Sequence, residues 1–160
     1  MLKNKLKKVN WKVLILSLIT VYLVGFIGNI FTYKSIGSAW YLLIRPAITP
    51  PGIVFTLVWN VLFFLIGIAL YLALTSSKKN QKKKVVWIFG ANLFLNMFWT
   101  FLFFGLQRPV LAYFELILFW VSIWVLIFEV YSVNKKASFI LIPYLLWVTF
   151  AGILNYLSII

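Results

Sequence analysis

Residues 45–75 read RPAITPPGIVFTLVWNVLFFLIGIALYLALT: an arginine and three prolines, then an uncharged and mostly apolar run. About 20 consecutive apolar residues are enough for a helix to cross a bilayer, so this run predicts a transmembrane helix. The whole chain is strongly apolar: 64% of its 160 residues are hydrophobic and only 11% are charged. A soluble domain of this length needs far more polar surface. The sequence therefore predicts an integral protein of the cell membrane.

Apolar runs of this length occur five times. Helices are the expected structure, because unpaired backbone amides are not tolerated in hydrocarbon and the runs lack the alternation of barrel strands. The first run follows a lysine-rich start, but it is too long for a signal peptide and no small-residue cleavage pattern follows it. We predict an all-α bundle of five transmembrane helices in a single domain, 1–160, with helices at about 13–31, 51–75, 85–104, 109–131 and 137–159.

The basic residues predict the orientation of these helices. When five spans are threaded alternately through a bilayer, twelve of the fifteen basic residues fall on one side, which indicates the cytoplasm. The N-terminus is thus expected inside and the loop 32–50 outside. The inner residues are Lys3, Lys5, Lys7, Lys8, Lys12, Lys78, Lys79, Lys82, Lys83, Lys84, Lys135 and Lys136, and the outer ones are Lys34, Arg45 and Arg108.

Composition also limits the chemistry. The chain has no cysteine and no histidine, which removes disulfides, thiolate metal sites and imidazole acid/base catalysis. Its net charge of +13 does not indicate nucleic acid, because the lysines sit in clusters between apolar runs without an interleaved aromatic surface. Their role is topogenic, with anionic lipid headgroups as the counter-charge.

Three of the predicted helices carry aromatic and polar residues along one face. Side chains at i, i+4, i+7 and i+11 share a helix face. Under the predicted orientation the three faces meet in the outer half of the membrane. They comprise Pro51, Phe55, Trp59, Phe63 and Gly67 in the second helix, Asn92, Asn96, Trp99 and Phe103 in the third, and Trp147, Ala151 and Asn155 in the fifth, with Phe150 and Leu154 beside the last three.

Two interpretations of these faces stay open. Asparagines bond across neighbouring helices and tryptophans fill gaps, so each residue on its own fits helix packing. Taken together, three such faces at one depth fit a cavity with flat aromatic walls and a few hydrogen-bonding groups. Trp11 and Trp87 fit interfacial anchors, whereas Trp120 and Trp124 are not placed.

Residues 32–50 form the longest connection, and connections of this size often cover a binding site. Pro46, Pro50 and Pro51 fix φ and lack an N–H, so the loop arrives with a defined path and Pro51 suits the first turn of the second helix. We expect a lid that holds Trp40, Tyr41 and Arg45 over the cavity. Arg45 fits either an anionic ligand group or an interfacial charge.

Three motifs, in this order and at these separations, resemble the TspO/MBR family over about residues 40–156. They are WYLLIRPAITPPGIVFTLVW followed by GIALY, then NLFLNMFWTFLFFG, then PYLLWVTFAGILNY. The resemblance implies a five-helix bundle, often a homodimer, that binds a tetrapyrrole, sterol or benzodiazepine-like ligand beneath the first loop and requires no cofactor. It implies pocket positions for Trp40, Tyr41, Pro51, Trp59, Asn92, Trp99, Trp147 and Ala151, with Asn96 and Phe150 beside them.

The chain departs from the family pattern at three places. Ile48 stands where many members have tryptophan, and Phe63 where they have tyrosine. The sterol motif attributed to the last helix needs a basic residue after its tyrosine, but Tyr156 is followed only by LSII. Sterol binding through that motif is not supported.

Three functions are compatible with these features. The leading hypothesis is a membrane receptor or carrier that binds protoporphyrin, haem or a similar flat ligand by stacking. The second is light-dependent porphyrin breakdown in the same pocket, which the resemblance implies for Trp59 and Trp147 and which light dependence would distinguish. The third is a small multidrug or ion transporter that uses Glu115 as a proton-coupled carboxylate. The odd number of spans without an evident internal repeat weighs against the third.

Overall fold

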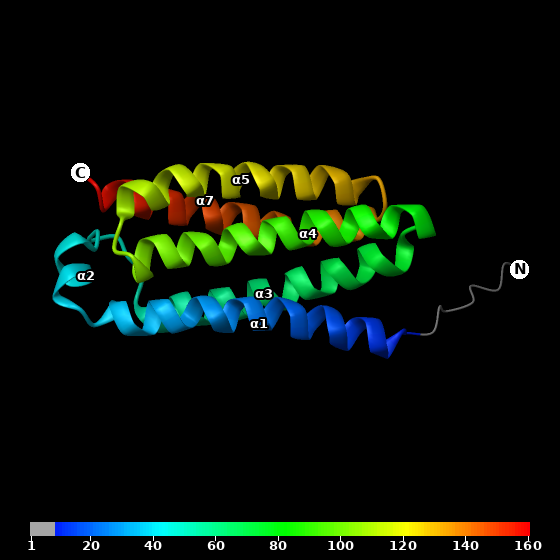
Figure 1. Cartoon of the computed structure of the whole chain (residues 1–160), viewed down its shortest axis with the longest axis horizontal. Helices are drawn as coiled ribbons and strands as arrows, with labels where there is room; N and C mark the ends of the chain where they lie inside the picture. The colour runs from blue at the N-terminus through cyan, green and yellow to red at the C-terminus, as the bar shows by residue number, and fades with distance from the viewer. Residues whose placement is uncertain (1–8) are drawn as a thin grey trace, which may run out of the picture.

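A computed structural model of the chain describes residues 9–160, and every regular element in this range is a helix. Figure 1 shows an elongated bundle of long helices that run side by side. The elements are α1 (Trp11–Ile36), α2 (Ala39–Ile44), α3 (Gly52–Ser76), α4 (Lys79–Thr100), a π-helix (Phe101–Gly105), α5 (Pro109–Tyr131), α6 (Lys135–Ile140) and α7 (Ile142–Leu157).

Among residues 9–160, five helices are long and apolar enough to cross a membrane, and each overlaps one of the predicted runs. The π-helix extends α4, and α6 and α7 together form the fifth span, Lys135–Leu157. The helical ends differ from the predicted ones where polar side chains cap them. Asn10 accepts a hydrogen bond from the Val13 N–H at 3.2 Å, and Asn134 accepts one from the Ala137 N–H at 3.0 Å, so two helices begin before their apolar runs.

The predicted loop 32–50 is largely helical in the structure. α1 continues to Ile36, and the short helix α2 lies between the end of α1 and the three prolines. Ser38 starts α2 by accepting a hydrogen bond from the Tyr41 N–H at 3.2 Å. Pro51 lies just before α3 and caps it through its carbonyl, which accepts from the Val54 N–H at 2.9 Å, instead of occupying the first helical turn.

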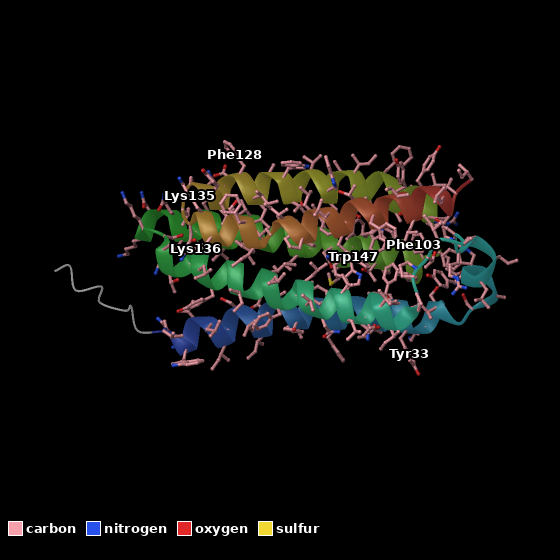
Figure 2. The ribbon with its side chains drawn as sticks, turned by 180° about the vertical axis from the view of Figure 1, so that it is seen from behind. Tyr33, Phe103, Phe128, Lys135, Lys136 and Trp147 are labelled. Atoms are coloured by element: carbon pink, nitrogen blue, oxygen red, sulfur yellow. The ribbon has the colours of Figure 1, made fainter. Side chains whose placement is uncertain are left out.

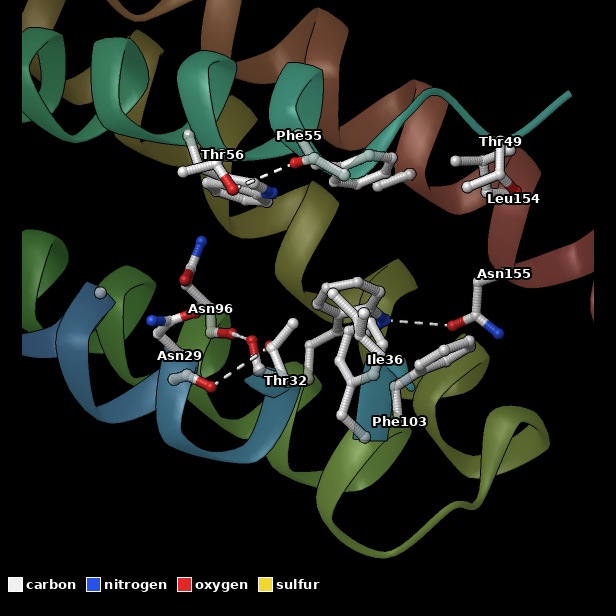
Figure 3. Close-up of a pocket in the computed structure, with 18 of the residues that line it drawn as sticks. Asn29, Thr32, Ile36, Thr49, Phe55, Thr56, Asn96, Phe103, Leu154 and Asn155 are labelled. Atoms are coloured by element: carbon white, nitrogen blue, oxygen red, sulfur yellow. Dashed lines mark hydrogen bonds between the residues drawn. The ribbon is translucent and has the colours of Figure 1, made fainter. Parts of the chain in front are cut away.

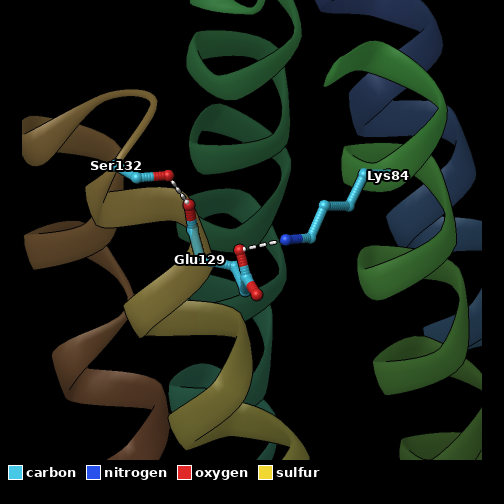
Figure 4. A network of polar contacts seen from close by, with 3 residues as sticks. All are labelled: Lys84, Glu129 and Ser132. Carbon is cyan, nitrogen blue, oxygen red and sulfur yellow. Dashed lines mark hydrogen bonds and ion pairs between the residues drawn. The ribbon is translucent and has the colours of Figure 1, made fainter. Parts of the chain in front are cut away.

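Most of the described lysines gather at one end of the bundle, here named the lysine end; the opposite end carries α2, with Lys34, Arg45 and Arg108 (Figures 1 and 2). The lysine end holds the start of α1, the α3–α4 connection and the start of α6. Lys84 Nζ lies 2.7 Å from Glu129 Oε2 there, and Ser132 Oγ donates to the Glu129 carbonyl at 2.8 Å (Figure 4). Lys3, Lys5, Lys7 and Lys8 lie outside the described residues.

The outer surface of the bundle carries many large apolar side chains. Leu118 is 63% exposed and Phe128 is 79% exposed, whereas Phe89 and Phe119 are fully buried. Acyl chains are as apolar as leucine, so such a surface suits a bilayer, and burial of apolar area contributes little to the association of the helices. Close packing and hydrogen bonds between helices must hold the bundle together instead.

α1 and α3 approach each other at two glycines. A Cβ atom added to Gly67 would lie 2.6 Å from Leu18 Cδ2 and 3.3 Å from the Leu18 Cα. A Cβ added to Gly25 would lie 2.4 Å from Phe63 Cε2. The absence of a side chain therefore brings the two helices together.

Replacing Gly67 by leucine is expected to destabilise the protein by about 1–3 kcal/mol, because the Leu18 backbone has to move away. Thermal unfolding in detergent, followed by circular dichroism, measures the change. Gly90→Leu is the matched control, since nothing lies within 4 Å of a Cβ at this mid-helix glycine of α4. Equal melting temperatures for the two variants would contradict the close-packing account.

Candidate functional site

A cavity of about 400 Å³ lies near the α2 end, between α1, α3, α4 with its π-helix, and α7 (Figure 3). Figure 3 shows Phe55 and Thr56 of α3 on one side and Asn29, Thr32 and Asn96 on the other. The walls divide into an aromatic part and a polar part. The aromatic part includes Phe55, Trp59, Phe63, Trp99, Phe103 and Phe104, and the polar part includes Asn29, Thr32, Thr56, Asn60, Asn96 and Thr100.

Two tryptophans line the aromatic part. The Trp59 ring stacks on Phe63 with centroids 5.4 Å apart and 30° between the planes. The Trp99 ring stacks on Phe103 at 5.6 Å and 28°. Trp99 Nε1 donates to Asn155 Oδ1 at 3.0 Å, and Asn155 Nδ2 donates to the Pro109 carbonyl at 2.9 Å. These contacts fix the Trp99 ring and satisfy its only donor, so what it offers a ligand is apolar ring surface.

A buried hydrogen-bond network lies behind the cavity. The Tyr144 hydroxyl accepts from Asn96 Nδ2 at 3.3 Å and donates to Asn92 Oδ1 at 3.0 Å. Asn92 Nδ2 donates to Ser122 Oγ at 2.8 Å, and Ser122 Oγ donates to the Phe119 carbonyl at 2.6 Å. The network joins α4, α5 and α7. Asn92 thus fits the helix-packing interpretation, whereas Asn96 takes part in the network and also lines the cavity.

α2 covers the end of the cavity. Trp40 contacts Phe103 with ring centroids 5.8 Å apart, and Tyr41 contacts Phe104 at 5.6 Å. Burial raises the pKa of the Tyr41 hydroxyl, and nearby Arg45 partly opposes this shift, so the hydroxyl stays protonated at neutral pH. Arg45 lines the cavity.

The structure brings half of the predicted site residues to the cavity wall and places the others around it. Tyr41, Trp59, Asn96, Trp99 and Ala151 line the cavity. Trp40 of α2 packs on Phe103, and Pro51 lies between the lining residues Pro50 and Gly52. Asn92 lies in the network, and Trp147 and Phe150 contact each other at 5.5 Å outside the lining. Their roles in binding, and in light-dependent chemistry for Trp59 and Trp147, stay predictions.

Helix geometry explains the position of Trp147. A strict spacing of four residues advances about 40° beyond a full turn each time, so Trp147 and Asn155 lie about 80° apart around α7. The buried face of α7 instead follows Tyr144, Val148, Ala151 and Asn155, whose mixed spacing of three and four stays on one side. Tyr144, the centre of the network, was therefore identifiable from the sequence by this spacing.

Sequence reasoning also missed the contribution of α1. Gly25, Gly28, Asn29 and Thr32 all line the cavity. Their positions at i, i+3, i+4 and i+7 define one helix face, which was the available signal. Small and polar residues on that face let α1 approach and supply hydrogen-bonding groups.

Glu115 is buried in α5 with 6% exposure, and neither carboxylate oxygen has a hydrogen-bond partner among residues 9–160. It is not among the residues that line the cavity. The same range contains no group of three or more metal-ligating His, Cys, Asp or Glu residues. The proposed transport role of Glu115 stays a prediction.

Comparison with known proteins decides the family. The sequence profile described as the TspO/MBR family matches residues 17–159, nearly the whole described chain. The chain belongs to the TspO/MBR family.

Individual relatives agree with this assignment. The Tryptophan-rich protein TspO of Chlorobaculum tepidum is 40% identical over 136 residues, which cover 83% of this chain and 85% of the relative. That of Archaeoglobus fulgidus is 38% identical over 144 residues, or 89% and 92% of the two chains. The Translocator protein of Bos taurus is 31% identical over 135 residues, or 82% and 79%. The TspO/MBR membership and the five spans together make the protein a multi-pass integral membrane protein.

Replacing Tyr144 by phenylalanine is expected to destabilise the protein by about 1–2 kcal/mol, because Asn92 and Asn96 each lose a buried partner. Thermal unfolding in detergent measures the loss. Tyr156→Phe serves as control, since the Tyr156 ring is 48% exposed and its hydroxyl makes no hydrogen bond to the described residues. An unchanged melting temperature for Tyr144→Phe would show that the network does not hold the helices.

Proposed function

We propose that this protein is a membrane receptor or carrier for a flat, largely apolar ligand with anionic groups, and that the ligand class is tetrapyrroles such as protoporphyrin or haem. One observation carries the proposal. The cavity combines the indole rings of Trp59 and Trp99 with a single cationic side chain, Arg45, and no carboxylate among its described lining residues.

The size and chemistry of the cavity support this ligand class. Its volume of about 400 Å³ lies within the range of small-molecule sites, about 300–1,000 Å³. A planar ring gains from stacking on aromatic side chains, while carboxylates form charge-assisted hydrogen bonds with a guanidinium. Thr49 lines the cavity, and its buried hydroxyl has no partner among residues 9–160. The ring would therefore lie toward Trp59 and Trp99, with its carboxylates toward Arg45 and Thr49.

The orientation and assembly belong to the same proposal. The lysine end faces the cytoplasm by the positive-inside rule, so the cavity lies in the outer half of the membrane. The name of the Bos taurus relative, Translocator protein, fits movement of a bound molecule. A homodimer is the assembly that the family resemblance implies, and it stays a prediction for this chain.

Protoporphyrin added to the purified protein is expected to quench tryptophan fluorescence saturably. Trp59→Leu is expected to weaken the affinity about tenfold, which corresponds to about 1.4 kcal/mol, because the stacking surface is lost. Trp124→Leu is the matched control, since this ring is 49% exposed on α5 and does not line the cavity. An affinity within twofold of the original protein for Trp59→Leu would rule out the stacking arrangement.

Arg45→Gln is expected to weaken binding of protoporphyrin about tenfold while leaving binding of its dimethyl ester unchanged, because only the free acid carries the carboxylates. Arg108→Gln is the control, because this arginine precedes α5 at the same end of the bundle and does not line the cavity. Equal losses for the acid and the ester would place the carboxylates away from Arg45.

A further inference from the structure

A second hollow lies on the outside of the bundle, between α3 and α7. This groove has a volume of about 460 Å³ and an almost entirely apolar lining, and it opens outward. Its walls include Leu57, Val58 and Val61 of α3 and Pro143, Leu146 and Trp147 of α7. Both helices are membrane-spanning segments, so the medium outside the groove is the acyl-chain region of the bilayer.

One aromatic pair links the groove to the cavity. Phe55 lines the cavity, Trp147 lines the groove, and their rings meet edge to face with centroids 5.2 Å apart. Figure 2 shows Trp147 between the ribbons of α3 and α7. α3 and α7 contact each other over few residues, whereas α3 packs extensively on α1. The Phe55–Trp147 pair thus closes a weakly packed seam.

Trp147 is held differently from Trp99 and Trp120. Trp99 Nε1 is bonded to Asn155 and Trp120 Nε1 to Thr149 at 2.8 Å, whereas Trp147 Nε1 is buried and has no partner among residues 9–160. Only ring packing positions the Trp147 indole. Turning it away from Phe55 breaks no hydrogen bond, so it is the tryptophan of these three best suited to move.

The route through the α2 end is covered by aromatic contacts of α2. Trp40 and Tyr41 of α2 pack on Phe103 and Phe104, and α2 is tied to α3 by a stretch with three prolines. A flat apolar ligand also partitions into the bilayer before it meets the protein. The α3–α7 seam faces that reservoir directly.

We propose that the groove between α3 and α7 is the entrance through which a flat apolar ligand passes from the bilayer into the cavity, with the Phe55–Trp147 pair as its gate. This inference rests on the proposed binding function of the cavity. It concerns the rate of entry, because an entrance lying outside the binding site changes association and dissociation together and leaves the equilibrium affinity unchanged.

The absence of cysteine in the chain allows the groove to be blocked selectively. Leu146→Cys introduces a thiol in the groove and Leu118→Cys introduces one on the lipid-facing side of α5; the original leucines are 65% and 63% exposed. Both variants are labelled with N-cyclohexylmaleimide and reconstituted into vesicles. Protoporphyrin is then supplied from donor vesicles, and its own fluorescence gives the rate of binding.

We expect the label on Leu146→Cys to slow binding at least tenfold without changing the final affinity, and the label on Leu118→Cys to change the rate less than twofold. Trp147→Leu is expected to bind several-fold faster, because the gate is smaller. If the Leu146→Cys label instead abolishes binding at equilibrium, the binding rate of Trp147→Leu tests the gate. A faster rate than in the original protein supports the gate, and an unchanged rate overturns it.

Other outcomes separate this inference from the proposed function. Saturable binding with an unchanged rate in labelled Leu146→Cys overturns the entrance and leaves the binding function intact. A label on Leu43→Cys, which lies on α2, is 85% exposed in the original protein and does not line the cavity, would place the entrance at the α2 end if it slows entry while the groove label does not. No saturable binding in the unlabelled protein overturns the proposed function and this inference with it.

Discussion

The architecture of this protein depends on the pair of hydrogen bonds made by one hydroxyl, that of Tyr144. Apolar burial does not favour helix association when the surrounding medium is itself hydrocarbon, so directional contacts must set how the helices fit. Tyr144 of α7 joins Asn92 and Asn96 of α4, and Asn92 continues the chain to Ser122 of α5. Three helices are thereby fixed in rotation and in register.

This fixed unit contributes residues of α4 and α7 to the cavity wall, and residues of α1 and α3 also line it. α1 and α3 meet through glycines at positions 25 and 67, and the Tyr22 hydroxyl of α1 donates to the Asn60 carbonyl of α3 at 3.0 Å. The cavity lies where the hydrogen-bonded unit and the glycine-packed pair face each other. Asn96 belongs to the hydrogen-bond network, since it donates to Tyr144, and it also lines the cavity. This residue therefore contributes both to the stability of the bundle and to the polarity of the cavity.

The five spans could be predicted from the sequence because polar residues are costly in hydrocarbon. Each span therefore appears as a run of about 20 mostly apolar residues. The sequence also predicted the face of α4, where Asn92, Asn96 and Trp99 follow the true helical period. Trp147 lies outside the cavity lining because a strict period of four drifts around the helix, and its role in binding stays a prediction. The polar face of α1 was overlooked, although its spacing was readable. Some asparagines bond to a neighbouring helix and others line the cavity. The difference depends on how the neighbouring helices are placed, and a hydropathy pattern does not contain that information.

The π-helix at Phe101–Gly105 has a consequence for communication within the fold. Its wider turn lets two adjacent residues serve the same region: Phe103 contacts both Trp99 and Trp40, and Phe104 contacts Tyr41. In a regular α-helix neighbouring side chains diverge by about 100°. The π-helix therefore connects Trp99, near the end of α4, with α2, which covers the cavity. The Trp99 ring also contacts Phe104, with centroids 6.1 Å apart, so a displacement of this ring acts on Trp40 and Tyr41 of α2 through both phenylalanines.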